Sequence, residues 1–206
     1  MVEQAARGPI PIEQIRGRIL KGIRKAQSDY GVWADGAWLS EAPEYFMTTY
    51  IAREIAAVPA ASWSLALEAD VRETMKQSGQ GRRRRRALRP DGRFDMLLSW
   101  GNRKPRAVIE VKQNVRGFWA VRADLARVTA ALGSKENSLQ CGILAFFMAM
   151  PDGVRKAARD RVWTRYESLV AKSKQFAGSQ GLRLDARNGG VSVDDGAALA
   201  VTLVVK

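Results

Sequence analysis

Residues 92–100, with the sequence GRFDMLLSW, and residues 107–112, with the sequence AVIEVK, decide the fold. Both are short apolar runs rich in residues that favour extended backbone, and Gly, Asn and Pro occur in residues 101–106 between them. This pattern predicts a β-hairpin. Because side chains alternate across a strand, Asp95 and Leu97 are expected on the same face.

The charged residues of this hairpin are expected to converge. Glu110 and Lys112 share a face of the second strand and lie about 7 Å apart along it. Folding the hairpin about residues 102–104 brings Asp95 opposite this pair, give or take a residue of register. Burying such groups costs several kcal/mol each unless they are paired or bind a metal. The sequence therefore indicates a functional use for them.

Asp95, fourteen intervening residues and then the tripeptide Glu110-Val111-Lys112 form a recognisable pattern. It resembles the signature of the PD-(D/E)XK nuclease superfamily, which has the restriction-endonuclease-like fold. The resemblance covers residues 42–150 in the order of elements. The literal Pro-Asp dipeptide of the signature also occurs at Asp91, but that residue lies in a Pro-Gly turn, whereas Asp95 lies inside the strand pattern.

The resemblance implies a metal-dependent nuclease and a role for each residue. Asp95 and Glu110 would bind Mg²⁺ or Mn²⁺, since these hard cations favour carboxylate oxygens. Val111 would offer its backbone carbonyl to the same metal. Lys112 would activate the attacking water or stabilise the transition state. The superfamily also takes an additional carboxylate from a helix before the sheet, and Glu44 matches that role best.

Glu44 is preferred because of its place on a predicted helix. Residues 40–58 begin with SEAPE, a typical helix start with Ser as the cap, and Glu44 lies near the centre line of the apolar stripe. Glu54, at the edge of the stripe, is the second choice. Glu68, at the end of a strand expected over residues 63–67, is the third. An exposed Glu44 that only complements the helix dipole remains an alternative.

The chain is strongly basic, with a formal net charge of +13. Such a field favours a polyanionic partner, most commonly nucleic acid. A run of arginines feeds directly into the Asp95 strand and is expected to contact the DNA backbone. A solvated loop of like charges is the plain alternative. The candidate nucleic-acid-binding residues are Arg82, Arg83, Arg84, Arg85, Arg86, Arg89 and Arg93.

Composition excludes several classes of site. The chain has no histidine, which excludes a Ser-His-Asp triad and a histidine general base. The single cysteine, Cys141, excludes a zinc finger and an internal disulfide, and is expected to be a small core residue. There is no sufficiently long apolar span and no signal-peptide pattern, so we expect a cytoplasmic protein that does not enter a membrane.

The element pattern predicts an α/β fold in a single nuclease-like domain, residues 1–206. We expect a restriction-endonuclease-like core of order α-β-β-β-α-β, with a mixed central sheet flanked by helices. The expected parts are an N-terminal helical extension (1–40), the catalytic core (41–150) and a C-terminal helix with extra strands (151–206). Further expected elements are helices over 12–27, 117–132 and 152–177, strands over 139–150, 181–186 and 198–205, an irregular connection over 29–38 and a turn over 188–190.

These observations predict a Mg²⁺-dependent endonuclease that hydrolyses DNA phosphodiester bonds. A homodimer is compatible with this expectation, because cutting both strands often uses two sites. Two alternatives stay open. The chain could be a nucleic-acid-binding module on the same fold that does no chemistry, or the charged trio could be a structural ion-pair cluster in a basic α/β protein of another function.

Overall fold

The hairpin at the centre of the sequence forms, within a mixed six-stranded sheet flanked by helices. The computed structural model describes residues 10–59, 63–79, 86–133, 137–150, 155–191 and 196–206. The helices are α1 (Ile12–Trp33), α2 (Glu44–Ala56), α3 (Val71–Gln77), α4 (Phe118–Leu132) and α5 (Arg155–Ser179), with short 3₁₀ turns η1 (Leu39–Glu41) and η2 (Arg86–Leu88). The strands are β1 (Trp63–Asp70), β2 (Arg93–Trp100), β3 (Pro105–Lys112), β4 (Cys141–Met150), β5 (Leu184–Val191) and β6 (Ala197–Val205).

The strands lie in the order β1-β2-β3-β4-β6-β5. Strands β3 and β4 are parallel and are connected through α4, while every other neighbouring pair is antiparallel. The chain is therefore an α/β protein, as expected. The predicted hairpin is confirmed, with Leu97 of β2 paired to Val108 of β3.

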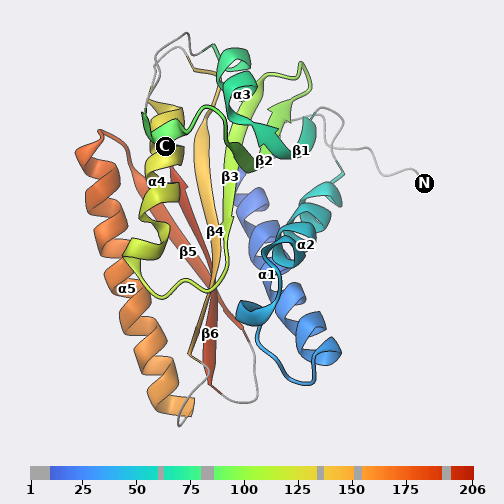
Figure 1. The fold of residues 1–206 in the computed structure, drawn as a ribbon, viewed down its shortest axis with the longest axis vertical. Helices are drawn as coiled ribbons and strands as arrows, with labels where there is room; N and C mark the ends of the chain where they lie inside the picture. Colours follow the sequence, from blue (N-terminus) through green and yellow to red (C-terminus); the bar gives the residue numbers. More distant parts are fainter. Residues whose placement is uncertain (1–9, 60–62, 80–85, 134–136, 151–154, 192–195) are drawn as a thin grey trace.

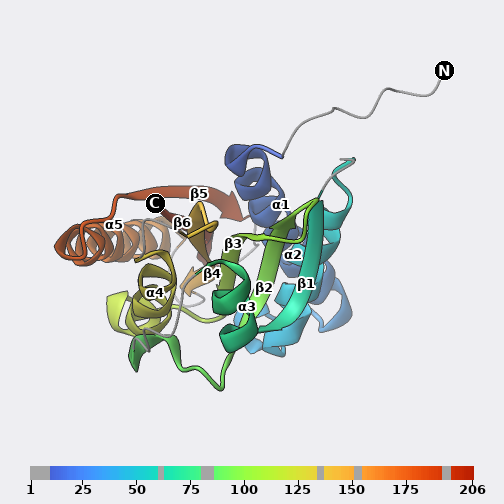
Figure 2. The same cartoon turned by 90° about the horizontal axis from the view of Figure 1, so that it is seen from above.

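Two layers of helices bury the two faces of the sheet (Figures 1 and 2). On one face, α1 and α2 pack against Met96, Ile109 and their neighbours. On the other, α4 and α5 pack against Val108, Phe146 and their neighbours. Strand β4 is buried along both faces, which explains its unbroken apolar sequence and confirms that prediction.

Helices α1 and α2 are in close contact. A Cβ atom added at Gly22 of α1 would lie 2.7 Å from the Cα atom of Ile51 in α2, closer than real Cβ atoms approach backbone. Glycine at this position therefore sets how near the two helices come.

Within the part of the chain that the structure describes, no helix is both long enough and apolar enough to cross a bilayer.

The first two helices differ from the sequence prediction at their ends. Helix α1 continues to Trp33, through residues predicted to be irregular, because the rings of Tyr30 and Trp33 pack edge-on against Phe46 of α2 at 5.5 and 5.4 Å. Helix α2 begins at Glu44 with Pro43 as its N-cap residue, so the predicted cap at Ser40 is wrong. Ser40 lies in the separate turn η1.

The predicted turn over residues 188–190 is also wrong. Strand β5 runs straight through Asn188-Gly189-Gly190, with Asn188 paired to Val201 and Gly190 to Leu199. β5 is the last strand of the sheet, and its backbone pairing with β6 keeps these glycines extended despite their low preference for strands. The continuous apolar sequence of β6 supplies that pairing.

Candidate functional site

The hairpin brings Asp95 and Glu110 together. Because Met96 pairs with Ile109, the register of β2 and β3 places Asp95 opposite Glu110. Oδ2 of Asp95 accepts a 2.6 Å hydrogen bond from the backbone N–H of Val111, and the carboxyl groups of Asp95 and Glu110 are close enough to influence each other electrostatically. Half-burial raises the pKa of the Asp95 carboxyl group above its usual value. The predicted meeting of these acids is present.

Glu110 is buried and held by an arginine that the sequence analysis did not single out for the site. Arg127 of α4 donates from Nε to Oε1 at 2.7 Å and from Nη2 to Oε2 at 2.6 Å. Burial raises the pKa of Glu110, and the guanidinium of Arg127, bonded to both carboxylate oxygens, opposes that rise and favours the ionised form. Arg127 also donates to the backbone carbonyl of Arg93 at 2.9 Å and lies 5.5 Å from the ring of Phe94.

Lys112 lies at the end of β3, two residues after Glu110. Its Nζ atom is 3.4 Å from Oδ2 of Asp124 on α4, and 40% of its side chain is exposed. Asp124 and Arg127 are three residues apart and so lie on the same side of α4. One helix therefore supplies a partner to each charged residue of the Glu-x-Lys pattern. The side chain of Val111 points the other way, into the core beside α1 and α2.

Glu44, in the first turn of α2, reaches the same end of β3. Its carboxylate accepts a hydrogen bond from the backbone N–H of Gln113. Although part of Glu44 is open to solvent, partial burial of the carboxyl group raises its pKa. The charge of Lys112 opposes the rise, and those of Asp95 and Asp124 add to it. Glu44 is therefore close to the predicted group.

Glu68 also lies beside Asp95. It falls between the pairs Leu67–Met96 and Ala69–Phe94 in the β1–β2 register, and its φ of +52° is a left-handed conformation unusual for glutamate. The hydroxyl of Tyr45 donates a hydrogen bond to the Glu68 carboxylate, which raises the pKa of Tyr45. The strained backbone is a feature that functional sites often contain.

Glu54, the second choice for the additional acid, belongs to a different cluster. It is buried between α1 and α2, where Nζ of Lys21 lies 2.9 Å, Nη1 of Arg18 3.5 Å and Nζ of Lys25 3.8 Å from its carboxylate. The hydrogen bond from Lys21 is the main cause that lowers the pKa of Glu54. Its contacts are those of a structural ion-pair group.

The predicted arginine run is described in part. Arg82, Arg83, Arg84 and Arg85 lie outside the described residues, and Arg86 opens η2. Arg89 and Arg93 are exposed, and Arg93 is the first residue of β2, two residues before Asp95. Arg93 therefore lies close to the acidic group.

The donor atoms suit a hard divalent cation, but the arrangement is not a ready-made site. Within the described residues, no group of three or more acidic or cysteine side chains is arranged to hold a metal ion. Asp95 and Glu110 supply adjacent carboxylates, with Glu44 nearby, which is the oxygen chemistry that Mg²⁺ and Mn²⁺ prefer. Arg127 already takes both oxygens of Glu110. The carboxylates of Asp95 and Glu110 therefore suit such a cation when the guanidinium of Arg127 releases Glu110.

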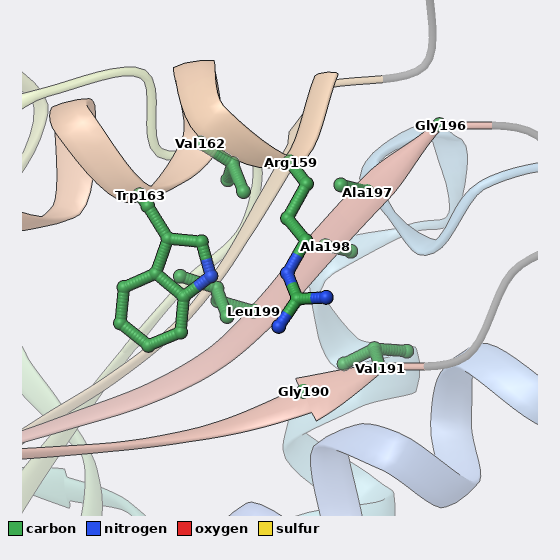
Figure 3. A pocket seen from close by; sticks show the side chains of 9 residues that line it. All are labelled: Arg159, Val162, Trp163, Gly190, Val191, Gly196, Ala197, Ala198 and Leu199. Atoms are coloured by element: carbon green, nitrogen blue, oxygen red, sulfur yellow. The ribbon is translucent and has the colours of Figure 1, made fainter. Parts of the chain in front are cut away.

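A separate pocket lies between α5 and the β5–β6 pair (Figure 3). Its walls are largely apolar, with Val162 and Trp163 on α5 and Leu199 on β6, and the guanidinium of Arg159 reaches over it. None of the predicted site residues lines this pocket. This pocket is therefore separate from the acidic residues around Asp95.

The sequence carried one signal for the partners on α4. Val121, Leu125 and Val128 mark the buried stripe of that helix, and Asp124 and Arg127 flank it on one side. Charged residues beside a buried stripe can reach charged groups on the sheet face that the helix covers, and Glu110 and Lys112 lie on that face of β3. Comparison with protein-family models, with curated proteins and with solved structures finds no match to this chain.

Proposed function

We propose that this chain is a metal-dependent nuclease that hydrolyses DNA phosphodiester bonds. The observation that carries the proposal is the approach of Asp95 to the β3 strand, where it is bonded to Val111 and lies opposite Glu110. The order α2-β1-α3-β2-β3-α4-β4 supports a restriction-endonuclease-like core, because it contains the superfamily's α-β-β-β-α-β order with one additional helix, α3, between the first two strands. Lys112 follows Glu110 on the same side of β3.

Phosphodiester hydrolysis needs neutralisation of the charge that develops on the phosphate and a hydroxide-like nucleophile. A bound Mg²⁺ or Mn²⁺ ion supplies both when present. Asp95 and Glu110 would hold the ion, together with the backbone carbonyl of Val111. Lys112, half-exposed at the strand end, is placed to orient a water molecule or to neutralise a phosphate oxygen. Glu44 would support the same metal site as an additional carboxylate.

The charge of the chain supports a polyanionic substrate. A net charge of +13 attracts DNA, and the exposed Arg93 lies next to the acidic group that would otherwise repel phosphate. A homodimer would place two such groups on one duplex, which is how both strands could be cut.

Cleavage of plasmid and linear DNA in Mg²⁺ or Mn²⁺ tests the proposal. We expect Asp95→Asn, Glu110→Gln and Lys112→Met each to reduce cleavage by roughly 10²-fold or more, the loss typical when an electrostatic group of a reaction site is removed. The matched control is Asp91→Asn, which alters the literal Pro-Asp dipeptide at an exposed position and should leave cleavage unchanged. An inactive wild-type protein, or variants that all cleave alike, would contradict the proposal.

A nucleic-acid-binding module without chemistry is the second candidate. It is favoured by one observation: Glu110 is paired with Arg127, and Lys112 with Asp124, so both charged residues of the pattern already have protein partners. Titration with Mn²⁺ separates the two candidates. The nuclease requires a divalent site that Asp95→Asn removes, whereas a binding module retains its DNA affinity without any divalent ion.

A further inference from the structure

We propose that Arg127 is a substitute cation: it neutralises Glu110 in the metal-free protein, yields that carboxylate to a divalent ion, and then binds a phosphate of the substrate. The inference rests on the proposed function, because it requires an ion at Asp95 and Glu110. It adds a substrate-binding residue and an order of events that the Asp and Glu-x-Lys pattern does not contain.

The contacts of Arg127 with Glu110 are those of a competitor for the carboxylate. Nε and Nη2 take one oxygen each, at 2.7 and 2.6 Å, and only 12% of the Arg127 side chain and 4% of the Glu110 side chain are exposed. A guanidinium bonded to both oxygens takes the bidentate position on the carboxylate, and its positive charge repels a metal ion nearby. Arg127 and a divalent ion therefore compete for Glu110.

Other contacts keep Arg127 beside the site when Glu110 is released. Nη2 donates to the carbonyl of Arg93 at 2.9 Å, and the guanidinium lies 5.5 Å from the centre of the Phe94 ring. Neither contact involves a carboxylate. The helix that carries Arg127 is fixed by the buried residues Leu125 and Val128. The displaced guanidinium thus stays near the start of β2. Because α4 is fixed, only the side chain of Arg127 moves.

The local charges favour such an exchange. The acids around Arg127 outnumber the cations, so an added divalent ion relieves repulsion among carboxylates rather than creating repulsion among cations. The acids are Glu44, Glu68, Asp95, Glu110 and Asp124, and the cations beside them are Arg93, Lys112 and Arg127. A released guanidinium presents paired N–H donors that match two oxygens of a phosphate, and DNA is the source of phosphate that the proposed function supplies.

The exchange predicts opposite effects on two measurements. Removal of the guanidinium should strengthen metal binding, because a competitor is lost, and weaken DNA cleavage, because a phosphate ligand is lost. An arginine that merely orients Glu110 for the metal would give the reverse sign for binding: its removal would weaken the metal site. The direction of the change in metal affinity therefore separates exchange from orientation.

The test is Mn²⁺ binding in the absence of DNA, followed by the electron paramagnetic resonance signal of the free ion. We expect Arg127→Gln to bind Mn²⁺ about tenfold more tightly than the wild type, within the usual range for coupling between two ligands. Arg127→Lys, which keeps the charge but loses the paired donors, should lie between them. Arg122→Gln, on the outer side of the same helix beside Trp119, is the matched control and should bind as the wild type does.

Each outcome decides the matter. Tighter Mn²⁺ binding by Arg127→Gln, with binding lost in Asp95→Asn, supports the exchange. Equal or weaker binding by Arg127→Gln, with binding still lost in Asp95→Asn, overturns the exchange and leaves the proposed function standing. No Mn²⁺ binding that depends on Asp95 overturns both. If Arg127→Gln does not fold, Arg127→Lys carries the same test, with a smaller gain in affinity expected and with no gain overturning the exchange.

Discussion

The carboxylate of Asp95 on β2 accepts a 2.6 Å hydrogen bond from the backbone N–H of Val111 on β3. This bond ties the first acid of the pattern to the strand that carries the second acid and the lysine. It continues the β2–β3 contact beyond the last backbone pair, Met96 with Ile109. The position of Asp95 is thus set by the hairpin itself, and the site and the sheet are built from the same residues.

Glu44 and Glu54 are expected to differ in what their removal changes. Glu44→Gln should reduce metal-dependent cleavage by about 10- to 100-fold, the usual effect of losing a group that supports a metal site. Its effect on the free energy of unfolding should stay within about 0.5 kcal/mol, because the side chain is exposed. Glu54→Gln should leave cleavage unchanged. The two variants compared in one cleavage assay decide which acid serves the site, and the reverse result would exclude Glu44.

The ionisation of Glu54 should make the free energy of unfolding depend on pH. Its lowered pKa, caused chiefly by Lys21, means that the folded protein favours the ionised form. The stabilisation is therefore complete above the unfolded-state pKa of about 4.3 and is lost as the pH falls through the folded-state pKa. Urea unfolding should show Glu54→Gln less stable than the wild type by about 1–2 kcal/mol at neutral pH, since its partners are partly exposed.

The difference between wild type and Glu54→Gln should shrink below about pH 4. The control is Glu167→Gln, a matched change at an exposed position of α5, which should alter the free energy of unfolding by no more than about 0.5 kcal/mol. A stability difference for Glu54→Gln that stays constant down to acid pH would show that the lowered pKa is not what stabilises the helix pair.

Two glycines of α1 should respond oppositely to alanine. At Gly22 the added Cβ atom would meet the Cα atom of Ile51 at 2.7 Å, so Gly22→Ala should lower the free energy of unfolding by about 1–3 kcal/mol. At Gly17 nothing lies within 4 Å, so Gly17→Ala should raise it by about 0.5–1 kcal/mol through helix propensity. Chemical denaturation measures both changes, and equal effects would mean that α1 and α2 are not closely packed.

Cys141 should be unreactive in the folded protein. It is fully buried at the start of β4, and burial raises the pKa of its thiol to about 11. Both access and the thiolate fraction are therefore low at about pH 8, and reaction needs the thiolate. A thiol reagent such as DTNB should label Cys141 only when denaturant is added. Rapid labelling of the native protein would contradict the burial of β4.

The hairpin could be predicted from the sequence because two local signals agree. The apolar runs around Phe94 and Ile109 require extended backbone, and the polar residues between them allow only a short turn. The exact register, with Met96 opposite Ile109, could be predicted only to within a residue, because both faces of β2 and β3 are buried and apolar. The approach of Asp95 to Glu110 is a consequence of that register.

The partners of the pattern could not be predicted in the same way. Arg127 meets Glu110 only because α4 packs back over the sheet. The angle between α4 and the strands does not follow from the residues near Arg127 in the sequence. The left-handed backbone of Glu68 depends on its place in the β1–β2 ladder. At Gly189 a local signal misled: glycine favours a turn in isolation, but pairing with Ala200 on β6 keeps this edge strand extended.

The most direct test of the account is a crystal structure of the protein soaked in Mn²⁺, with anomalous scattering recorded for the metal. We expect a Mn²⁺ peak between Asp95 and Glu110, at about 2.0–2.2 Å from their carboxylate oxygens, with Arg127 turned away from Glu110. A crystal saturated with Mn²⁺ that shows no peak there, and in which Arg127 still holds both oxygens of Glu110, would contradict it.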